Sequence, residues 1–497
     1  MPPLLPAFSL IACLPVLVLL LRAQAGAFLP LEMSRDAGPS TARSLNGSVP
    51  LDVNSYPVAP PDLELEQVHV YIRHGERTPV GVRMADPPAS IPKHWMFCHT
   101  ARNFRAAVSS ATPSIPGVRG PVGGGEAQQQ ESLRTVRVVE RPDGTAAPGE
   151  CLLGELTDIG RQTTYDYGRG LRQLYIDKLG FLPDVASSHD DVYLRSTNVP
   201  RTIESLQQIA HGLYPDSKST SDFIPQLRIR NGKDENLFGN TLACKRLEIL
   251  QVGFAKAAAS EWNDTLAPLD KKLSKYIGGN PVRLDGKPRA SGILDTVRAA
   301  NAHGIAVPPE LKDPAVVDLI EKAVVHEWFA GYQTEEVRRL GMGPLLSDLS
   351  RKMQAKAMNA SGDSLKILIH STHDTCLAAL CSTLDVFDNR WPAFSSAVTF
   401  ELFRRRTQPE KQQQSIWQSV LAPFRQHTDA STEHYVRMRY QNRNLPLPVC
   451  AEDGKHLPGS PEFCTLAAFQ ERIRELTPVD WDAECAPAGL HGKHGGR

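Results

Sequence analysis

The stretch VHVYIRHGERTP, from Val68 to Pro79, joins an alternating apolar run to a turn crowded with charged residues. Val68, Val70 and Ile72 alternate with polar or amphipathic residues, which is the period of a β-strand. The alternation stops where the letters RHG begin. The stretch therefore predicts a strand that carries His74, with arginines beside it, at its carboxyl end.

Further strands and helices alternate along the rest of the chain. The patterns predict helices over Leu156 to Leu179 (with Thr157 as N-cap), Pro200 to Leu213 and Leu377 to Leu384, and strands over Asp191 to Leu194, over Leu365 to Ile369, and around Val398 and Val436. Such alternation indicates an α/β fold, here a three-layer, mainly parallel sheet flanked by helices. Ligands of these folds bind at the carboxyl ends of the strands.

The chain of 497 residues exceeds the size of one hydrophobic core, so we expect a large domain with an insertion. The expected parts are a signal peptide over 1–25, a flexible leader over 26–64, an α/β core over 65–215 and 364–485, a mainly helical lid over 216–363 and a disordered tail over 486–497. Residues 109–149 are rich in Gly and Gln and are expected to form a loop insertion in the core.

The first residues have the pattern of a secretory signal peptide. An apolar run from Leu4 to Leu21 precedes the small residues AQA, which a signal peptidase can read. The run lacks a preceding Lys or Arg, so a retained membrane anchor stays open, although its two prolines favour cleavage. We expect a secreted protein, or one in the lumen of the secretory or vacuolar pathway, with membrane contact only if the segment is retained.

The cysteines agree with an oxidising compartment. Of the 9, Cys13 lies in the signal segment, and the remaining even set is expected to form disulfides. Cys450 and Cys464 flank a short loop with Gly and Pro turns, so we predict that they are partners. Sequons for N-glycosylation stand at Asn46, Asn263 and Asn359.

The overall charge excludes a general attraction to nucleic acid. Formal net charge is zero because 55 basic residues balance 55 acidic ones, and the sequence has no arginine-rich tract. After the signal segment, no stretch of the sequence is apolar and long enough to cross a bilayer. Specificity must therefore reside in a local site.

Three segments that follow predicted strands carry the side chains suited to chemistry. They supply Arg73, His74 and Arg77, then Arg195, and finally His373 with Asp374. Guanidinium groups match phosphate oxygens with paired N–H donors and stay charged at any relevant pH. An imidazole can act as a nucleophile and a carboxyl group as a general acid. The set favours a phosphoryl-transfer site over a surface cluster of basic residues.

These motifs make the chain resemble the histidine acid phosphatases of the phosphoglycerate mutase-like superfamily. The matching segments are RHGERTP from Arg73, GELTDIG from Gly154, RSTN from Arg195 and HD at His373. RSTN together with WPAF from Trp391 is most similar to the lysophosphatidic acid phosphatase branch and its fungal relatives. Asn198 departs from the commonest pattern, in which Asp follows RST.

The resemblance implies a role for each matched residue. His74 would be the nucleophile that forms a phosphohistidine, and Asp374 would protonate the leaving oxygen. Arg73, Arg77, Arg195 and His373 would bind the phosphate of a small-molecule phosphate monoester. We expect no cofactor, and no metal, because arginines around the site repel a cation even though His370, His373 and Asp374 could be read as ligands.

The substrate of the expected acid phosphatase stays open on sequence alone. A broad acid phosphatase and a lysophosphatidic acid phosphatase both fit. A phytase fits less well, because 216–363 mixes charges of both signs and the dyad continues as HDTC rather than HDTN. A secreted binding protein with an inactive phosphatase fold is the alternative from another class, and the intact His74 and Asp374 disfavour it.

Overall fold

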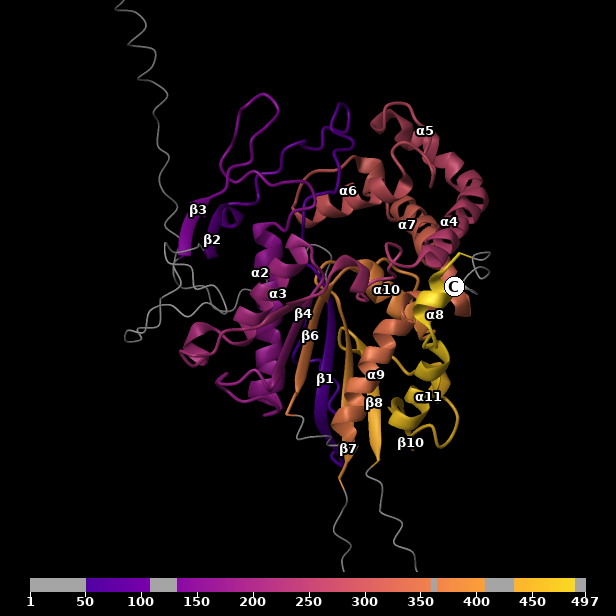
Figure 1. The fold of residues 1–497 in the computed structure, drawn as a ribbon. Helices are drawn as coiled ribbons and strands as arrows, with labels where there is room; N and C mark the ends of the chain where they lie inside the picture. The colour runs from indigo at the N-terminus through magenta and orange to yellow at the C-terminus, as the bar shows by residue number, and fades with distance from the viewer. Residues whose placement is uncertain (1–50, 108–131, 359–363, 407–432, 488–497) are drawn as a thin grey trace, which may run out of the picture. The chain divides into compact units, whose positions relative to one another are not determined.

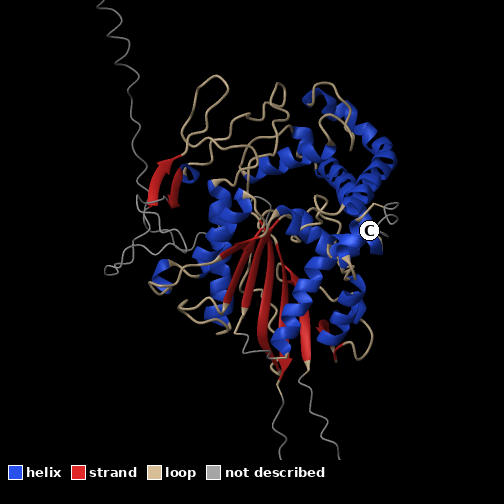
Figure 2. Ribbon diagram, in the orientation of Figure 1, coloured by secondary structure: helices blue, strands red, loops and turns tan. Residues whose placement is uncertain are grey.

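A mixed β-sheet with helices on both faces forms the core of the fold (Figures 1 and 2). The computed structural model describes residues 51–107, 132–358, 364–406 and 433–487. In spatial order the strands are β10 (His456–Leu457), β11 (Ser460–Thr465), β8 (His434–Tyr440), β7 (Ala397–Arg405), β1 (Leu63–Arg73), β6 (Ile367–Thr372), β4 (Val192–Ser196) and β5 (Leu227–Ile229), with β9 (Arg443–Asn444) beside β8.

The predicted α/β class is confirmed, but the sheet is mixed rather than mainly parallel, because its C-terminal strands return antiparallel to β1. β1, β6, β4 and β5 pair in parallel, which places their carboxyl ends at one edge of the sheet. β7, β8, β11 and β10 pair antiparallel, and β7 joins them to β1. The parallel half supplies the polar segments that the sequence singled out.

Helices cover both faces of the sheet. One face carries α2 (Asp158–Arg172) and α3 (Pro200–Leu213), and the other carries α9 (Gly343–Ala357), α10 (Asp374–Thr383) and α11 (Leu466–Leu476). The remaining helices are α4 (Lys245–Leu266), α5 (Asp270–Leu273), α6 (Ala290–Ala302), α7 (Pro314–Phe329), α8 (Glu335–Gly341) and α12 (Trp481–Cys485). As predicted, Thr157 caps α2 by accepting a hydrogen bond from the backbone N–H of Gly160.

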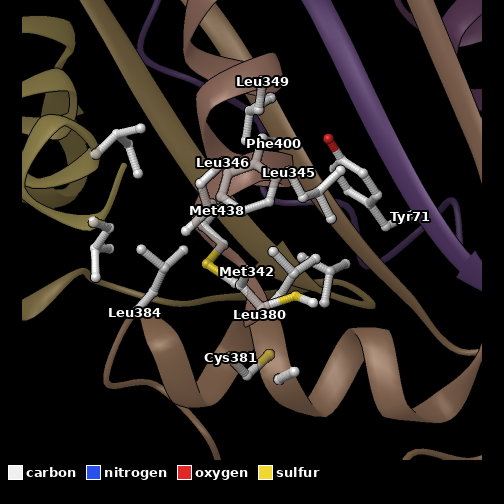
Figure 3. Packing of buried hydrophobic residues seen from close by; sticks show 14 of the residues in the cluster. Tyr71, Met342, Leu345, Leu346, Leu349, Leu380, Cys381, Leu384, Phe400 and Met438 are labelled. Atoms are coloured by element: carbon white, nitrogen blue, oxygen red, sulfur yellow. The ribbon is translucent and has the colours of Figure 1, made fainter. Parts of the chain in front are cut away.

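The alternation along β1 explains the two-faced core. Val68, Val70 and Ile72 pack with α2 and α3, whereas Tyr71 points to the opposite face. On that face, leucines of α9 and α10 pack against Phe400 of β7 and the neighbouring strands (Figure 3). The apolar positions that predicted the strand therefore bury one of its two faces.

Several expected boundaries differ from the structure. The 109–149 insertion is not loop alone, because β3 (Ser132–Val136) pairs antiparallel with β2 (Asn103–Ala107). The expected leader already packs before β1: Tyr56 is buried and its hydroxyl donates to Glu401 of β7 at 3.1 Å. The local sequence is polar at both places and did not predict either feature. The β2–β3 pairing and the Tyr56–Glu401 contact depend on residues that are distant in the chain.

The 216–363 segment is mostly helical, as expected, but its ends belong to the core. β5 extends the main sheet beside β4, and α9 packs against the sheet face that carries Tyr71. All described residues fall in one compact unit, Ser44–Arg497. The division into a core and a lid remains a prediction.

The cysteines pair less completely than expected. Among the described residues, disulfides join Cys98 to Cys151, Cys244 to Cys485, and Cys450 to Cys464, the last being the predicted pair. Cys376 and Cys381 are free and buried in α10. The expectation that they too form disulfides is wrong, because residues five apart on one helix point in different directions.

Some predicted features lie outside the described residues. These are the signal segment, the sequons at Asn46 and Asn359, and most of the tail. Asn263 lies in α4, where its side-chain amide donates to Asp285 at 2.9 Å, and its glycosylation stays a prediction. In the described part of the chain, no helix is long and apolar enough to cross a membrane.

Candidate active site

Three neighbouring strand ends bring the candidate residues together. β1 ends at Arg73, directly before His74, and β6 leads into His373 and Asp374. β4, on the other side of β6, leads into the start of α3. Because the three strands are parallel, these segments meet at the carboxyl edge of the sheet, where α/β folds place their ligands.

The turn after β1 requires glycine at a close backbone approach. A Cβ on Gly75 would lie 2.4 Å from the carbonyl oxygen of Gly160, in the first turn of α2. A Cβ on Gly160 would in turn lie 2.2 Å from the carbonyl oxygen of Glu76. The GELTDIG segment thus serves the site by letting α2 pack directly on the turn that carries His74.

His74 is buried, and its surroundings favour the neutral imidazole. Its Nδ1 lies 2.9 Å from the carbonyl oxygen of Gly75, which can only accept, so Nδ1 carries the proton and Nε2 is left bare. Burial, and then the charges of Arg73, Arg201 and Arg77, hold the pKa of His74 well below its usual value. The imidazole therefore stays unprotonated in acid.

Guanidinium groups surround this imidazole. Arg73 donates to the carbonyl of Pro392 at 2.6 Å and forms an ion pair with Asp374 at 2.7 Å. Arg77 forms an ion pair with Asp295 of α6 at 2.8 Å. Burial lowers the pKa of Arg73 to about 10, and its neighbouring arginines act in the same direction. The cluster holds more positive charge than its protein partners balance.

Arg201, in the first turn of α3, is a member of this cluster that the sequence interpretation missed. Its charge acts on both His74 and His373, and burial followed by Arg77 lowers its own pKa to about 10. Its Nε has no hydrogen-bond partner, and it forms no ion pair with any residue that the structure describes. The sequence predicts a helix that begins at Pro200, shortly after a strand end. Arg201 lies in the first turn of that helix, so this prediction could have placed it near the site.

The structure does not bring Arg195 into the cluster. Arg195 is fully buried in β4, pairs with Glu235, and donates to Asn236 at 2.8 Å. It is absent from the charges that act most strongly on the pKa of His74. The expectation failed because alternate residues of a strand face opposite sides, and Arg195 lies on the face opposite α2 and α3.

The RSTN segment instead positions His373. The Thr197 hydroxyl lies 3.0 Å from Nε2 of His373 and 2.8 Å from the hydroxyl of Thr202. Burial, followed by the charge of Arg201, lowers the pKa of His373 to about 4. Its ring centre lies 5.7 Å from that of His74. Asn198, where the sequence departs from the commonest pattern, is exposed to solvent.

Asp374 is buried at the first residue of α10 and is held by several donors. Its Oδ2 accepts from the indole of Trp391 at 2.9 Å and from Arg73, and its Oδ1 accepts from the backbone N–H of Thr375 at 2.9 Å. Burial alone would raise the pKa of Asp374, but Arg73, Arg77 and Trp391 outweigh it and hold the pKa below its usual value. These contacts favour the carboxylate form of Asp374.

The WPAF segment contacts Arg73 and Asp374, which its sequence resemblance alone did not reveal. Besides the Trp391 and Pro392 contacts, the ring of Phe394 lies 4.0 Å from the guanidinium carbon of Arg73. A cation above an aromatic face is stabilised, so Phe394 helps to fix Arg73. Asp295 was missed as well, because nothing in an amphipathic helix distinguishes an acid that reaches the site.

Metal coordination has no support from side-chain clustering in the described residues. They contain no group of His, Cys, Asp or Glu side chains arranged to hold a metal ion. His370, a metal-ligand candidate from the sequence, stacks on Tyr71 with ring centres 4.5 Å apart. The pair lies on the sheet face that packs with α9 and α10.

A neutral imidazole, guanidinium groups and a carboxyl group at one sheet edge define a phosphoryl-transfer site. The family profile of the Histidine phosphatase superfamily (branch 2) matches residues 64–441, which include all of these groups. The chain belongs to this superfamily, and the expected histidine acid phosphatase family is confirmed.

Individual relatives agree with this assignment. A Schizosaccharomyces pombe protein described as a probable acid phosphatase is 34% identical over 452 residues, covering 86% of this chain and 95% of the relative. Lysophosphatidic acid phosphatase type 6 of Mus musculus is 26% identical, covering 74% and 80%. The solved apo form of Hafnia alvei phytase covers 86% of this chain and 99% of its own, with 14% identity and a TM-score of 0.50, which shows a shared fold.

Proposed function

We propose that the protein hydrolyses phosphate monoesters in two steps, with His74 as nucleophile and Asp374 as general acid and then base. In the first step Nε2 of His74 bonds to phosphorus while the ester P–O bond breaks, and Asp374 gives its proton to the leaving oxygen. In the second step water bonds to phosphorus while the P–Nε2 bond to His74 breaks, Asp374 takes a proton from that water, and inorganic phosphate leaves. The observation that supports this proposal is the unprotonated Nε2 of His74, which guanidinium groups surround.

The proposed phosphate ligands are Arg73, Arg77, Arg201 and His373. The arginines would neutralise the charge on the phosphoryl oxygens, His373 would donate a hydrogen bond, and together they would stabilise the charge that develops during transfer. Arg201 replaces Arg195 as a proposed phosphate ligand. Arg201 lacks a carboxylate partner among the described residues, and its charge acts on both histidines. No metal is needed for this chemistry, since guanidinium groups supply the positive charge.

An acidic pH optimum follows from the opposing demands on two groups. His74 must be neutral, and its lowered pKa keeps it so at low pH. Asp374 must be protonated, yet Arg73, Arg77 and Trp391 outweigh the effect of burial and lower its pKa. A bound phosphate dianion offsets the arginine charge and raises the pKa of Asp374 in the substrate complex. The acid form is therefore available below neutrality.

The relatives and the fold also bear on which phosphate monoester is the physiological substrate. A lysophospholipid phosphatase is the alternative supported by the mouse relative named for that activity. A phytase is supported less, because the solved phytase shares the fold at 14% identity. An inactive binding protein is disfavoured by the complete set of reacting groups. Disulfides are typical of exported proteins, and they support a secreted or lumenal location.

Replacement of Asp374 by Asn tests the acid role. With an alkyl phosphate, whose alkoxide is a poor leaving group, the rate of phosphoryl transfer to His74 should fall by about 10²- to 10⁴-fold. With a nitrophenyl phosphate, whose leaving group needs little protonation, transfer should fall far less, and phosphoenzyme should accumulate because the second step is slowed. Rapid mixing, alkaline quenching and detection of a phosphate label on His74 measure both. An equal loss of transfer with both esters would remove Asp374 from the acid role.

A further inference from the structure

A pocket of about 410 Å³ borders the proposed general acid. Thr375, the residue after that acid, lines the pocket. Phe238 lines it too, and its ring centre lies 6.3 Å from that of His373. Trp328, another lining residue, meets Trp391 edge-on at 5.7 Å. The pocket therefore lies next to residues that adjoin or contact Asp374, His373 and Trp391, beside the part of the site where the leaving alcohol would be protonated.

Aromatic side chains form much of the wall of this pocket. Phe254, Phe329 and Tyr332 join Phe238 and Trp328 around it. Trp328 is 46% exposed, although it is the largest kind of apolar side chain. An exposed aromatic wall beside a reaction centre is suited to an apolar group that covers it when bound.

One wall of the pocket also carries a buried carboxylate. The side chain of Glu327 is 2% exposed, and its Oε1 accepts from Nη2 of Arg289. Its Oε2 has no hydrogen-bond partner among the described residues. A buried carboxylate oxygen without a partner is costly, and a ligand hydroxyl beside this wall would supply the missing partner.

We propose that this pocket binds the alcohol part of the substrate, an apolar chain that bears a hydroxyl group, and that Oε2 of Glu327 accepts a hydrogen bond from that hydroxyl. The proposal rests on the proposed function and deepens it, because it names the class of ester that the site selects. The aromatic wall would take the chain, and Glu327 would distinguish a hydroxylated chain from a plain one.

The charges of the pocket favour a neutral hydroxyl over the alternatives. Among its described lining residues, Arg289 and Glu327 are the charged ones, and they pair with each other. Arg289 therefore opposes an ammonium group at the same carboxylate. A second phosphate would meet the charge of Glu327 and would find one cation, which is poorly suited to an inositol polyphosphate.

The protonation of Glu327 is compatible with this choice. Burial raises the pKa of Glu327, and Arg289 opposes that rise. A hydroxyl can donate to the carboxylate and accept from the carboxylic acid, so the contact survives in acid. An ammonium group would lose its partner when Glu327 is protonated.

The test compares esters that differ only in the alcohol part. The panel contains ethyl phosphate, octyl phosphate, a set of hydroxyoctyl phosphates with the hydroxyl at successive carbons, and phosphocholine. We expect kcat/KM to rise from ethyl to octyl phosphate, and to rise about tenfold more for the hydroxyl position that reaches Glu327. Trp328→Ala should lower kcat/KM for octyl phosphate about tenfold and leave ethyl phosphate unchanged.

Variants at Glu327 separate recognition from folding. Glu327→Leu should abolish the preference for the hydroxylated ester while ethyl phosphate is still hydrolysed, and Glu327→Gln, which keeps an oxygen acceptor, should restore part of it. Arg289 stays half exposed in both, so its loss of a partner is mild. The matched control is Glu150→Leu, because Glu150 is also a buried acid paired with an arginine, Arg141. That change should affect all esters equally, and thermal unfolding identifies the folded variants.

Each outcome decides between the two proposals. If wild-type protein hydrolyses ethyl phosphate but treats octyl and all hydroxyoctyl esters alike, the pocket assignment is overturned while the phosphatase proposal stands. A hydroxyl preference that persists in Glu327→Leu overturns the role of Glu327. A preference for phosphocholine that is lost in the same variant assigns the pocket to a cation instead. Absence of turnover with every ester overturns the proposed function itself.

Discussion

Two clusters of buried arginines in this protein differ in how their donors are satisfied. In the first, at the candidate active site, Arg73 and Arg201 have pKa values lowered to about 10 by burial and by like charges. In the second, on β7 and β8, Arg437 and Arg439 share Glu401. Burial opposes the charge of Arg439 there too, but Glu401 raises its pKa.

In the second cluster, hydrogen bonds join the arginines, Glu401 and two tyrosines to one another. Glu401 accepts from Tyr175 at 2.8 Å, Arg437 donates to Tyr56 at 2.7 Å, and Arg439 donates to Tyr175 at 3.0 Å. In the first cluster, by contrast, the Nε atoms of Arg73, Arg77 and Arg201 have no partner among the described residues. Buried arginines alone therefore do not identify an anion site. A lowered pKa together with donors left without partners does.

The largest expected effect is the loss of the proposed nucleophile in the first cluster. His74→Ala should abolish turnover, by more than about 10⁴-fold, because no phosphohistidine can form. Steady-state hydrolysis of a nitrophenyl phosphate measures the loss. Glu401→Gln, in the second cluster, should leave turnover of the folded protein within a few fold at pH near neutrality. Equal losses in the two variants would mean that the clusters do not differ in function.

The second prediction compares Arg201, the proposed phosphate ligand, with Arg195, to which the sequence analysis gave that role. Arg201→Ala should lower kcat/KM by about 10²- to 10³-fold and weaken inhibition by inorganic phosphate, with little loss of stability. Arg195→Ala should instead cost about 3–5 kcal/mol of stability, because Glu235 is left buried without its partner. Phosphate inhibition and urea unfolding, measured on both variants, report the two effects. Weakened phosphate inhibition in Arg195→Ala alone would return Arg195 to the site.

The sequence predicted most of the architecture because local patterns decide it. The alternation in β1, the cap at Thr157 and the start of α3 at Pro200 depend on neighbouring residues, and all are confirmed. The hairpin of β2 and β3 and the packing of Tyr56 depend on distant partners and were missed. Likewise, motif order proposed His74, His373 and Asp374, which the structure brings to one edge of the sheet, whereas the choice between Arg195 and Arg201 depends on which way a strand residue faces.

Acid stability is a further test of the second cluster. Burial would raise the pKa of Glu401, but Arg437 and Arg439 lower it from 4.5 to about 2. A pKa that is lower in the folded state contributes stability above the unfolded value and loses it as pH falls. The wild-type protein should therefore lose stability between about pH 4.5 and pH 2. Glu401→Gln should be less stable at neutral pH and should lose less on acidification, as urea unfolding at several pH values can show. An unchanged acid dependence would contradict this role of Glu401.

The smallest expected effect concerns Trp391 and the acidity of Asp374. The indole N–H donates to the carboxylate at 2.9 Å and so favours the charged form, which lowers the pKa. Trp391→Phe keeps an aromatic ring against Phe329 and removes the donor. The pKa of Asp374 should rise, and the alkaline limb of the kcat profile should move to higher pH by roughly half to one unit. The matched control is Trp481→Phe, because that indole donates to the backbone carbonyl of Leu340, outside the site, and its loss should not move the limb. A limb that stays in place in Trp391→Phe, or moves equally in both variants, would mean that Trp391 packs beside the acid without setting its pKa.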